Sequence, residues 1–185
     1  DSPAALVLSG PHFFLANPLN KTPDQVSVTR GQYSGLDLGD LPIDYLPRTN
    51  YKPSLNTNEY LRRTPRVGWI EADAVAPKPV TDYFRLVNRE MIVPANERTY
   101  ISALIPPGVS HLNTILAHAF RNAEDLCGAL AWSHSVLADF RVKSTGMGHA
   151  NTTLVEQLPI PEEWHTAAIA RALALNPKVL LLDEP

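Results

Sequence analysis

The sequence predicts one α+β domain with mixed or antiparallel strands, many loops and a long helix late in the chain. Short segments rich in β-branched and aromatic residues lie in the middle of the chain, whereas helical periodicity appears only after residue 122. Seventeen prolines divide the chain into short pieces. The composition, 44% hydrophobic and 19% charged, is that of a globular domain. No run of 18 apolar residues indicates a membrane span.

The N-terminal region, residues 1–47, is expected to be an extended segment that packs on a core. Residues 4–8 are apolar and predict a short strand, and the Gly-Pro and Asn-Pro pairs that follow predict loop. Three glycines and two Leu-Pro pairs favour extended backbone over 31–47.

The core is expected over residues 48–161. We predict its strands at 67–72, 84–93 and 98–105. A helix is expected over 123–140, with Asn122 as its N-cap and acidic residues in its first turn. Four apolar side chains fall on one face of this helix: Leu126, Leu130, Leu137 and Phe140.

The C-terminal region, residues 162–185, is expected to hold a helix over 161–175 and then a short tail. Proline is acceptable at the first helical position, and Asn176-Pro177 would end the helix. The chain starts without methionine and stops after an acidic pair, so we expect a fragment of a longer protein.

Charge is distributed unevenly along the chain. The net charge is −3, but residues 48–143 carry twelve basic and nine acidic side chains between two acidic ends. A mildly basic middle permits a polyanionic partner without requiring one.

Recognisable catalytic and metal motifs are absent from the sequence. It has no phosphate-binding G-x-x-x-x-G-K-[ST] loop, no G-x-G-x-x-G and no G-x-S-x-G elbow. The six histidines lack the i,i+4 spacing of a zinc enzyme, and Cys127 is expected to be a buried thiol. We therefore predict no catalytic residue, no metal ligand and no cofactor in this chain.

Four sequence blocks resemble one protein family. They are Gly-Pro-His-Phe at 10–13, Asp-Tyr-Leu-Pro-Arg-Thr-Asn-Tyr at 44–51, Asn-Glu-Arg-Thr-Tyr-Ile-Ser-Ala-Leu-Ile-Pro-Pro-Gly at 96–108 and Leu-Pro-Ile-Pro at 158–161. In this order they resemble the C-terminal target-recognition region of Eco57I-like adenine-specific DNA methyltransferases of restriction-modification and phage-defence systems. The resemblance covers about residues 5–175.

The resemblance implies a division of labour. The parent enzyme would bind S-adenosylmethionine and methylate adenine N6 in a preceding catalytic domain. The Asn-Pro-Leu-Asn at 17–20 lacks the second proline and the aromatic residue of that domain's catalytic signature. This chain would then select the DNA sequence in the bacterial cytoplasm, and its partners would be double-stranded DNA and the methyltransferase catalytic domain.

Candidate DNA-binding residues fall into three groups, because DNA recognition needs cations for phosphates and forked or amide side chains for base edges. The groups are Arg48, Thr49, Asn50, Tyr51 and Lys52; then Arg62, Arg63 and Arg66; then Arg141, Lys143, Ser144 and Thr145. The alternatives are, in the same order, a turn tied by its own hydrogen bonds, a solvated face and an ordinary helix exit. Arg98 is expected to form a structural ion pair or a buried cap.

Residues 169–185 resemble a different family, the segment of ABC-transporter ATPases that leads into the Walker B strand. The resemblance implies that Asp183 would assist Mg²⁺ and Glu184 would polarise a water molecule. The remainder of an ATP site is missing from the sequence, so this tail is either a composite join or an accidental likeness. Two alternative functions remain open, an ABC-type ATPase fragment and a protein-interaction module of a phage-defence system.

Overall fold

The computed structural model describes residues 6–13, 21–26, 32–42, 45–53 and 56–159. The chain is α+β, as predicted, with small sheets and short helices. The helix expected over 161–175 and the Walker-B-like tail lie outside the described residues. Within the described ranges, no helix is both long enough and apolar enough to cross a membrane.

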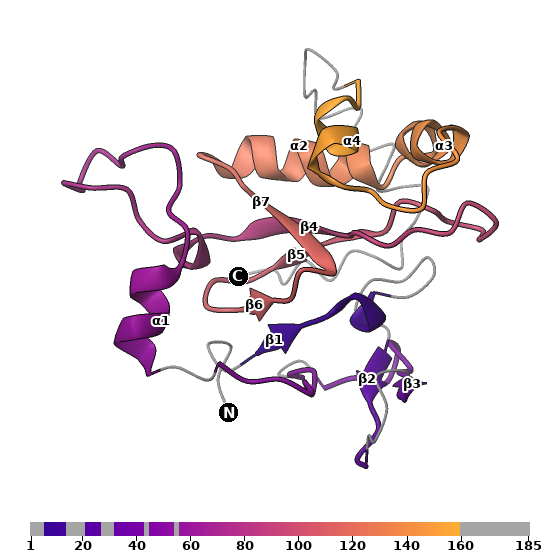
Figure 1. Cartoon of the computed structure of the whole chain (residues 1–185), viewed down its shortest axis with the longest axis horizontal. Helices are drawn as coiled ribbons and strands as arrows, with labels where there is room; N and C mark the ends of the chain where they lie inside the picture. Colours follow the sequence, from indigo (N-terminus) through magenta and orange to yellow (C-terminus); the bar gives the residue numbers. More distant parts are fainter. Residues whose placement is uncertain (1–5, 14–20, 27–31, 43–44, 54–55, 160–185) are drawn as a thin grey trace.

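A three-stranded antiparallel sheet forms the centre of the fold (Figure 1). Its strands are β4 (Arg85–Arg89), β5 (Ser102–Ile105) and β7 (Ile115–Ala119), and β4 is the middle strand. The strands predicted over 84–93 and 98–105 are therefore confirmed as shorter segments. The sequence analysis missed β7.

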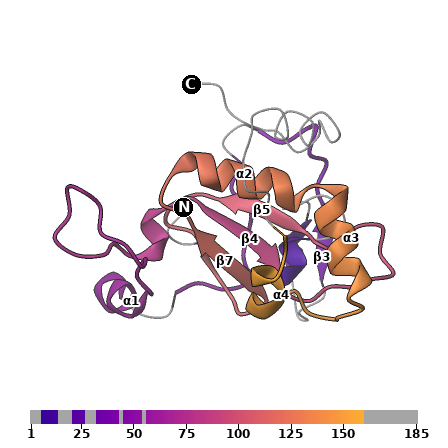
Figure 2. The same cartoon turned by 90° about the horizontal axis from the view of Figure 1, so that it is seen from above.

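The middle strand, β4, is covered on both of its faces. Because side chains alternate along a strand, Leu86 and Val87 point to opposite faces. Leu86 packs with Leu126 and Ala129 of α2 (Ala123–Ser133), which lies across one face of the sheet (Figure 2). Val87 points to the opposite face, where it packs with Leu8 and Phe13 of the N-terminal region.

The N-terminal region forms a second layer below the sheet (Figure 1). It contains β1 (Val7–Leu8), the 3₁₀ helix η2 (Gly10–His12), β2 (Lys21–Pro23) and β3 (Tyr33–Gly35). β1 pairs in parallel with β6 (Ser110–His111), and β2 pairs with β3. The Gly10 amide donates to Thr114 Oγ1 at 2.9 Å and Arg89 Nη1 to the Phe13 carbonyl at 3.2 Å.

The single helix predicted over 123–140 is wrong. Two helices occupy this region, α2 and α3 (Val136–Ser144), and the helical backbone is interrupted at His134 and Ser135. Ser135 has extended backbone, with ψ at 151°, and its side chain caps α3 by accepting the Ala138 amide. The break turns Leu137 and Phe140 away from the sheet, so each is 68% exposed. The predicted N-cap is confirmed, because the Asn122 side chain accepts the amide of Asp125.

The strand predicted over 67–72 is also wrong. This segment belongs to a loop that returns through Pro77 and Pro79, and only an isolated bridge joins Arg66 to Pro79. Because proline has no amide hydrogen, the returning segment does not form a pairing ladder. The loop is held instead by Glu71, which accepts hydrogen bonds from Trp69 at 2.8 Å and Tyr83 at 2.9 Å. A short 3₁₀ helix, η3 (Val80–Asp82), leads from it into β4.

Three further features differ from the sequence predictions. The polar stretch 48–66 contains a helix, α1 (Thr57–Arg63), and a short helix α4 (Thr152–Glu156) follows α3. Cys127 is exposed, contrary to its predicted burial, because it follows the buried Leu126 by one residue and so points to the outer side of α2.

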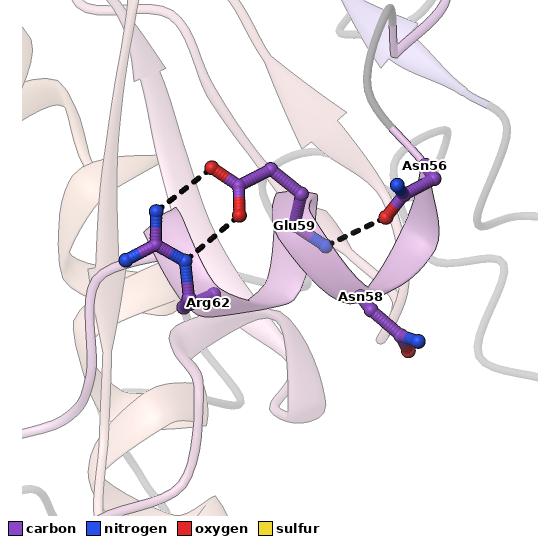
Figure 3. Close-up of a pocket in the computed structure, with 4 residues that line it drawn as sticks. All are labelled: Asn56, Asn58, Glu59 and Arg62. Atoms are coloured by element: carbon purple, nitrogen blue, oxygen red, sulfur yellow. Dashed lines mark hydrogen bonds and ion pairs between the residues drawn. The ribbon is translucent and has the colours of Figure 1, made fainter.

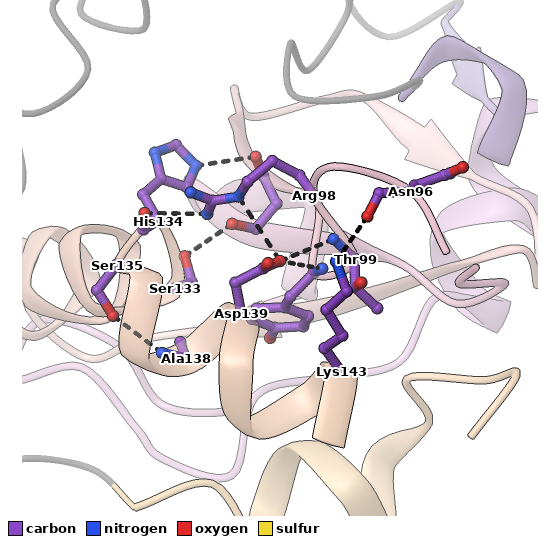
Figure 4. Close-up of polar contacts among 11 residues, drawn as sticks. Asn96, Arg98, Thr99, Ser133, His134, Ser135, Ala138, Asp139 and Lys143 are labelled. Carbon is purple, nitrogen blue, oxygen red and sulfur yellow. Dashed lines mark hydrogen bonds and ion pairs between the residues drawn. The ribbon is translucent and has the colours of Figure 1, made fainter. Parts of the chain in front are cut away.

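Asp139 ties α3 to the segment that leads into β5 (Figure 4). Its buried Oδ1 accepts the amides of Thr99 at 2.8 Å and Tyr100 at 2.7 Å, and lies 3.6 Å from Arg98 Nε. Arg98 also donates to the His134 carbonyl at 3.0 Å. The structural ion pair expected for Arg98 is confirmed, and it closes the junction between α2 and α3.

Asp139→Ala is expected to destabilise the fold by about 3 kcal/mol, because it leaves two buried amides and a partly buried guanidinium without their acceptor. Asp139→Asn keeps an acceptor oxygen but loses the charge, so we expect it to cost about half as much. Urea unfolding of both variants measures the difference. Equal stability of Asp139→Ala and the unmodified chain would contradict this role.

One buried histidine, His12, and three half-buried histidines make the stability of the fold dependent on pH. His12 is fully buried; its Nδ1 accepts the Ser9 amide at 3.1 Å and its Nε2 donates to the Arg48 carbonyl at 2.9 Å. Burial lowers the pKa of His12 below its ordinary value, and burial does the same for His111, His118 and His134. The folded chain therefore takes up protons at lower pH than the unfolded chain.

The free energy of unfolding is expected to fall as the pH drops below about 6.5, where unfolded histidines bind protons and the buried ones do not. Each unit of pKa difference contributes about 1.4 kcal/mol. His12→Asn should show a smaller loss of stability between about pH 7.5 and about pH 5.5 than the unmodified chain. The exposed His149, changed to Asn, is the control. An unaltered pH profile in His12→Asn would refute the assignment.

Candidate nucleic-acid interface

The candidate interface is the outer side of α1, whose inner side is anchored to the core. The Tyr60 hydroxyl hydrogen-bonds with the Ser110 hydroxyl on β6. Asn56 begins the helix by accepting the Glu59 amide at 2.9 Å. The helix ends at Thr64, because the following Pro65 favours extended backbone at that position.

Three charged side chains of α1 form one ion-paired cluster. Glu59 Oε2 lies 2.8 Å from Arg62 Nε, and Glu59 Oε1 lies 2.6 Å from Arg63 Nε. The side chains of Arg62 and Arg63 are 71% and 64% exposed, whereas that of Glu59 is 28% exposed. Hydrogen bonds from Arg62 and Arg63 hold the pKa of Glu59 below its ordinary value. The same contact raises the pKa of Arg62.

An open hollow of about 570 Å³ lies against this cluster and is lined by Asn56, Asn58, Glu59 and Arg62 (Figure 3). Amide, carboxylate and guanidinium groups are the side chains that read adenine, cytosine and guanine edges, respectively, in DNA grooves. Guanidinium groups also bind phosphates. The chemistry of this hollow suits a nucleic acid.

Sequence reasoning missed Asn56, Asn58 and Glu59. Two signals were available: an asparagine three residues before a glutamate is a helix-start pattern, and the glutamate precedes two arginines at helical spacings. Reading 48–66 only as a polar, basic stretch concealed both signals.

The first predicted group, residues 48–52, is divided between internal bonds and the surface. Arg48 Nη2 donates to the Pro23 carbonyl at 2.6 Å, and Thr49 Oγ1 donates to the Tyr51 carbonyl at 2.7 Å. For Arg48 and Thr49 the structure therefore agrees with the alternative interpretation, in which this stretch is a turn held by its own hydrogen bonds. Four of the five residues are exposed, namely Arg48, Asn50, Tyr51 and Lys52, and Thr49 is half-buried.

Arg66 follows α1 directly and is exposed at the base of the proline-containing loop. Its Nη1 donates to the Pro77 carbonyl at 2.6 Å. The second predicted group, Arg62, Arg63 and Arg66, is therefore on the surface, with each guanidinium engaged in a contact within the chain.

The third predicted group lies at the end of α3. Lys143 Nζ donates to the Asn96 carbonyl at 2.8 Å, Ser144 to the Arg141 carbonyl and Thr145 to the Val142 carbonyl. Gly146, with φ at 66°, then ends the helix. The bonds of Ser144 and Thr145 are those of a helix exit, whereas Lys143 is tied to the segment that precedes β5. Arg141 is exposed.

The structure separates the third group from the other two. α1 and α3 lie at opposite ends of the molecule in both views (Figures 1 and 2). A single continuous surface formed by residues 48–66 and 141–145 is therefore not what the fold provides.

The described residues include no cluster of three or more His, Cys, Asp or Glu side chains that could hold a metal ion. Asp183 and Glu184 lie outside the described part of the chain. In comparisons with known proteins, no family model matches the chain, and no curated protein or solved structure shows a significant match to it.

Proposed function

We propose that this chain is a DNA target-recognition domain of an adenine-N6 DNA methyltransferase and that α1 is its main DNA contact. The observation that carries the proposal is the outer side of α1, where Arg62 and Arg63 are exposed and Arg62 lines a hollow together with Asn56 and Asn58. The four-block resemblance supplies the enzyme class. Methyl transfer and S-adenosylmethionine binding belong to the catalytic domain, the proposed protein partner.

The size and anchoring of α1 suit insertion into a DNA groove. An α-helix with its side chains is about 10–12 Å in diameter, and the major groove, about 12 Å wide, admits it. The Tyr60 hydroxyl ties the inner side of the helix to β6, and the Asn56 cap fixes the residue at which the helix begins. We assign Arg62, Arg63 and Arg66 to phosphates and Asn58 to a base edge.

Arg62→Ala combined with Arg63→Ala is expected to weaken binding to duplex DNA and to reduce its salt dependence. Each lost phosphate contact lowers the slope of log affinity against log salt by about one unit. Fluorescence anisotropy on random duplexes of about 25 base pairs, between about 50 and about 200 mM salt, measures both quantities.

Arg141→Ala is the matched control, because it also removes an exposed guanidinium from the last turn of a helix, but at the opposite end of the molecule. Its affinity and slope should stay close to those of the unmodified chain. An unchanged slope in the double variant would assign Arg62 and Arg63 to an ordinary solvated face.

One observation favours a second candidate function, contact with a protein. Val136, Leu137 and Phe140 on α3 are each 68% exposed and lie within one and a half turns. Exposed apolar side chains grouped in this way are typical of protein-binding surfaces. The occupant that we propose is the methyltransferase catalytic domain. Failure of the chain to bind any duplex at low salt would make this contact its principal function.

A further inference from the structure

We infer that Glu59 is a specificity-determining residue that restrains Arg62 and Arg63 from binding phosphates at random DNA sites. The inference rests on the proposed DNA-recognition function and deepens it. Glu59 would release the two arginines at a target site, where its carboxylate accepts a hydrogen bond from the amino group of a cytosine.

The geometry of the cluster supports this restraint. One carboxylate receives three donors: Arg62 Nε at 2.8 Å, Arg62 Nη2 at 2.8 Å and Arg63 Nε at 2.6 Å. The contact to Arg62 is therefore a two-pronged fork, the strongest geometry for this pair of groups. The spacings of three and four residues bring the groups together on one helix face.

The net charge of Glu59, Arg62 and Arg63 sets how strongly the cluster attracts a DNA phosphate. Two guanidinium groups and one carboxylate carry a net charge of +1. A phosphate that approaches Arg62 or Arg63 finds only the N–H donors that Glu59 leaves free, and the carboxylate repels it. Binding to random DNA depends almost entirely on phosphates, so the carboxylate weakens this mode of binding most.

A target site compensates for the loss of the ion pairs. Ionised glutamate is an acceptor only, and the cytosine amino group is the donor that carboxylates read in the major groove. Glu59 is among the residues that line the open hollow; its carboxylate points toward Arg62, while Asn58 points away from this pair (Figure 3). Glu59 therefore raises the ratio of the affinity for the target site to the affinity for random DNA, because its carboxylate repels phosphates at every site and accepts a hydrogen bond from cytosine only at the target.

The direct test is Glu59→Gln, which removes the charge and keeps the shape of the side chain. Glutamine suits the third position of a helix, so α1 is expected to form, and circular dichroism checks this. On random duplexes at about 50 mM salt the variant should bind at least about threefold more tightly, with a salt slope steeper by less than about one unit, because the restraint is partial and Arg62 and Arg63 already contact phosphates in the unmodified chain. Equal affinity and slope would overturn the inference.

Glu156→Gln is the matched control for the general effect of removing a negative charge, because Glu156 is exposed on α4, away from α1 (Figure 1). It should change the affinity and the slope little. A gain equal to that of Glu59→Gln would show that net charge, and not the ion-paired cluster, limits binding.

A double-mutant cycle tests whether Glu59 acts through the arginines. When Arg62 and Arg63 are already alanine, Glu59→Gln should no longer strengthen binding to random duplexes. A gain that persists in this background would overturn the restraint.

Selection from the random pool tests the cytosine contact. The unmodified chain should enrich duplexes with a C·G pair at one fixed position, and Glu59→Gln should lose the preference at that position alone. Identical selected sequences would overturn the contact.

The outcomes separate this inference from the proposed function. Absence of binding by the unmodified chain, at low salt and on every duplex in the pool, would overturn the DNA-recognition proposal and this inference with it. Binding by the unmodified chain that Glu59→Gln leaves unchanged would overturn the role of Glu59 alone.

Discussion

Burial of β4 on both of its faces is the constraint on which the rest of the structure depends. Its neighbours β5 and β7 satisfy its backbone, so a covering layer is needed above and below. α2 provides one layer through Leu86, and the N-terminal region provides the other through Val87. Arg85 and Arg89 lie on the Val87 side and donate to the carbonyls of Val109 and Phe13, so guanidinium groups as well as apolar contacts fix the lower layer.

Sequence reasoning identified the segments whose composition matched their structure. Aromatic and β-branched residues in and beside β4 and β5 marked the segments 84–93 and 98–105, whereas β7, Ile-Leu-Ala-His-Ala, gave a weaker signal. The helical error had a different cause. The helical spacing of apolar residues continued across Ser135. The Ser135 side chain, however, caps a second helix that begins at the next residue, and apolar periodicity does not show where one helix ends and another begins. The false strand at 67–72 had suitable residues and lacked a partner strand.

The candidate interface could be predicted only in part. The exposure of Arg62, Arg63 and Arg66 agrees with their charge, but their shared dependence on Glu59 became visible only when the stretch proved to be helical. Residues 141–145 have the same basic and polar side-chain types as residues 48–66 but lie far from them in the fold, and spacing along the sequence does not reveal this distance. Bonds such as that from Arg48 to the Pro23 carbonyl depend on loop geometry and have no sequence pattern.

The contact between His12 and Arg48 has a consequence for how such a domain can change. It joins the blocks at 10–13 and 44–51, while the block at 96–108 holds the amides that Asp139 binds, and Leu158 is buried beside α4. Residues of these blocks therefore hold the layers of the fold together. The outer side of α1 lies outside all of them, and its side chains hold no layer in place. The side chains on the outer side of that helix can therefore be replaced by others without a change in the rest of the fold.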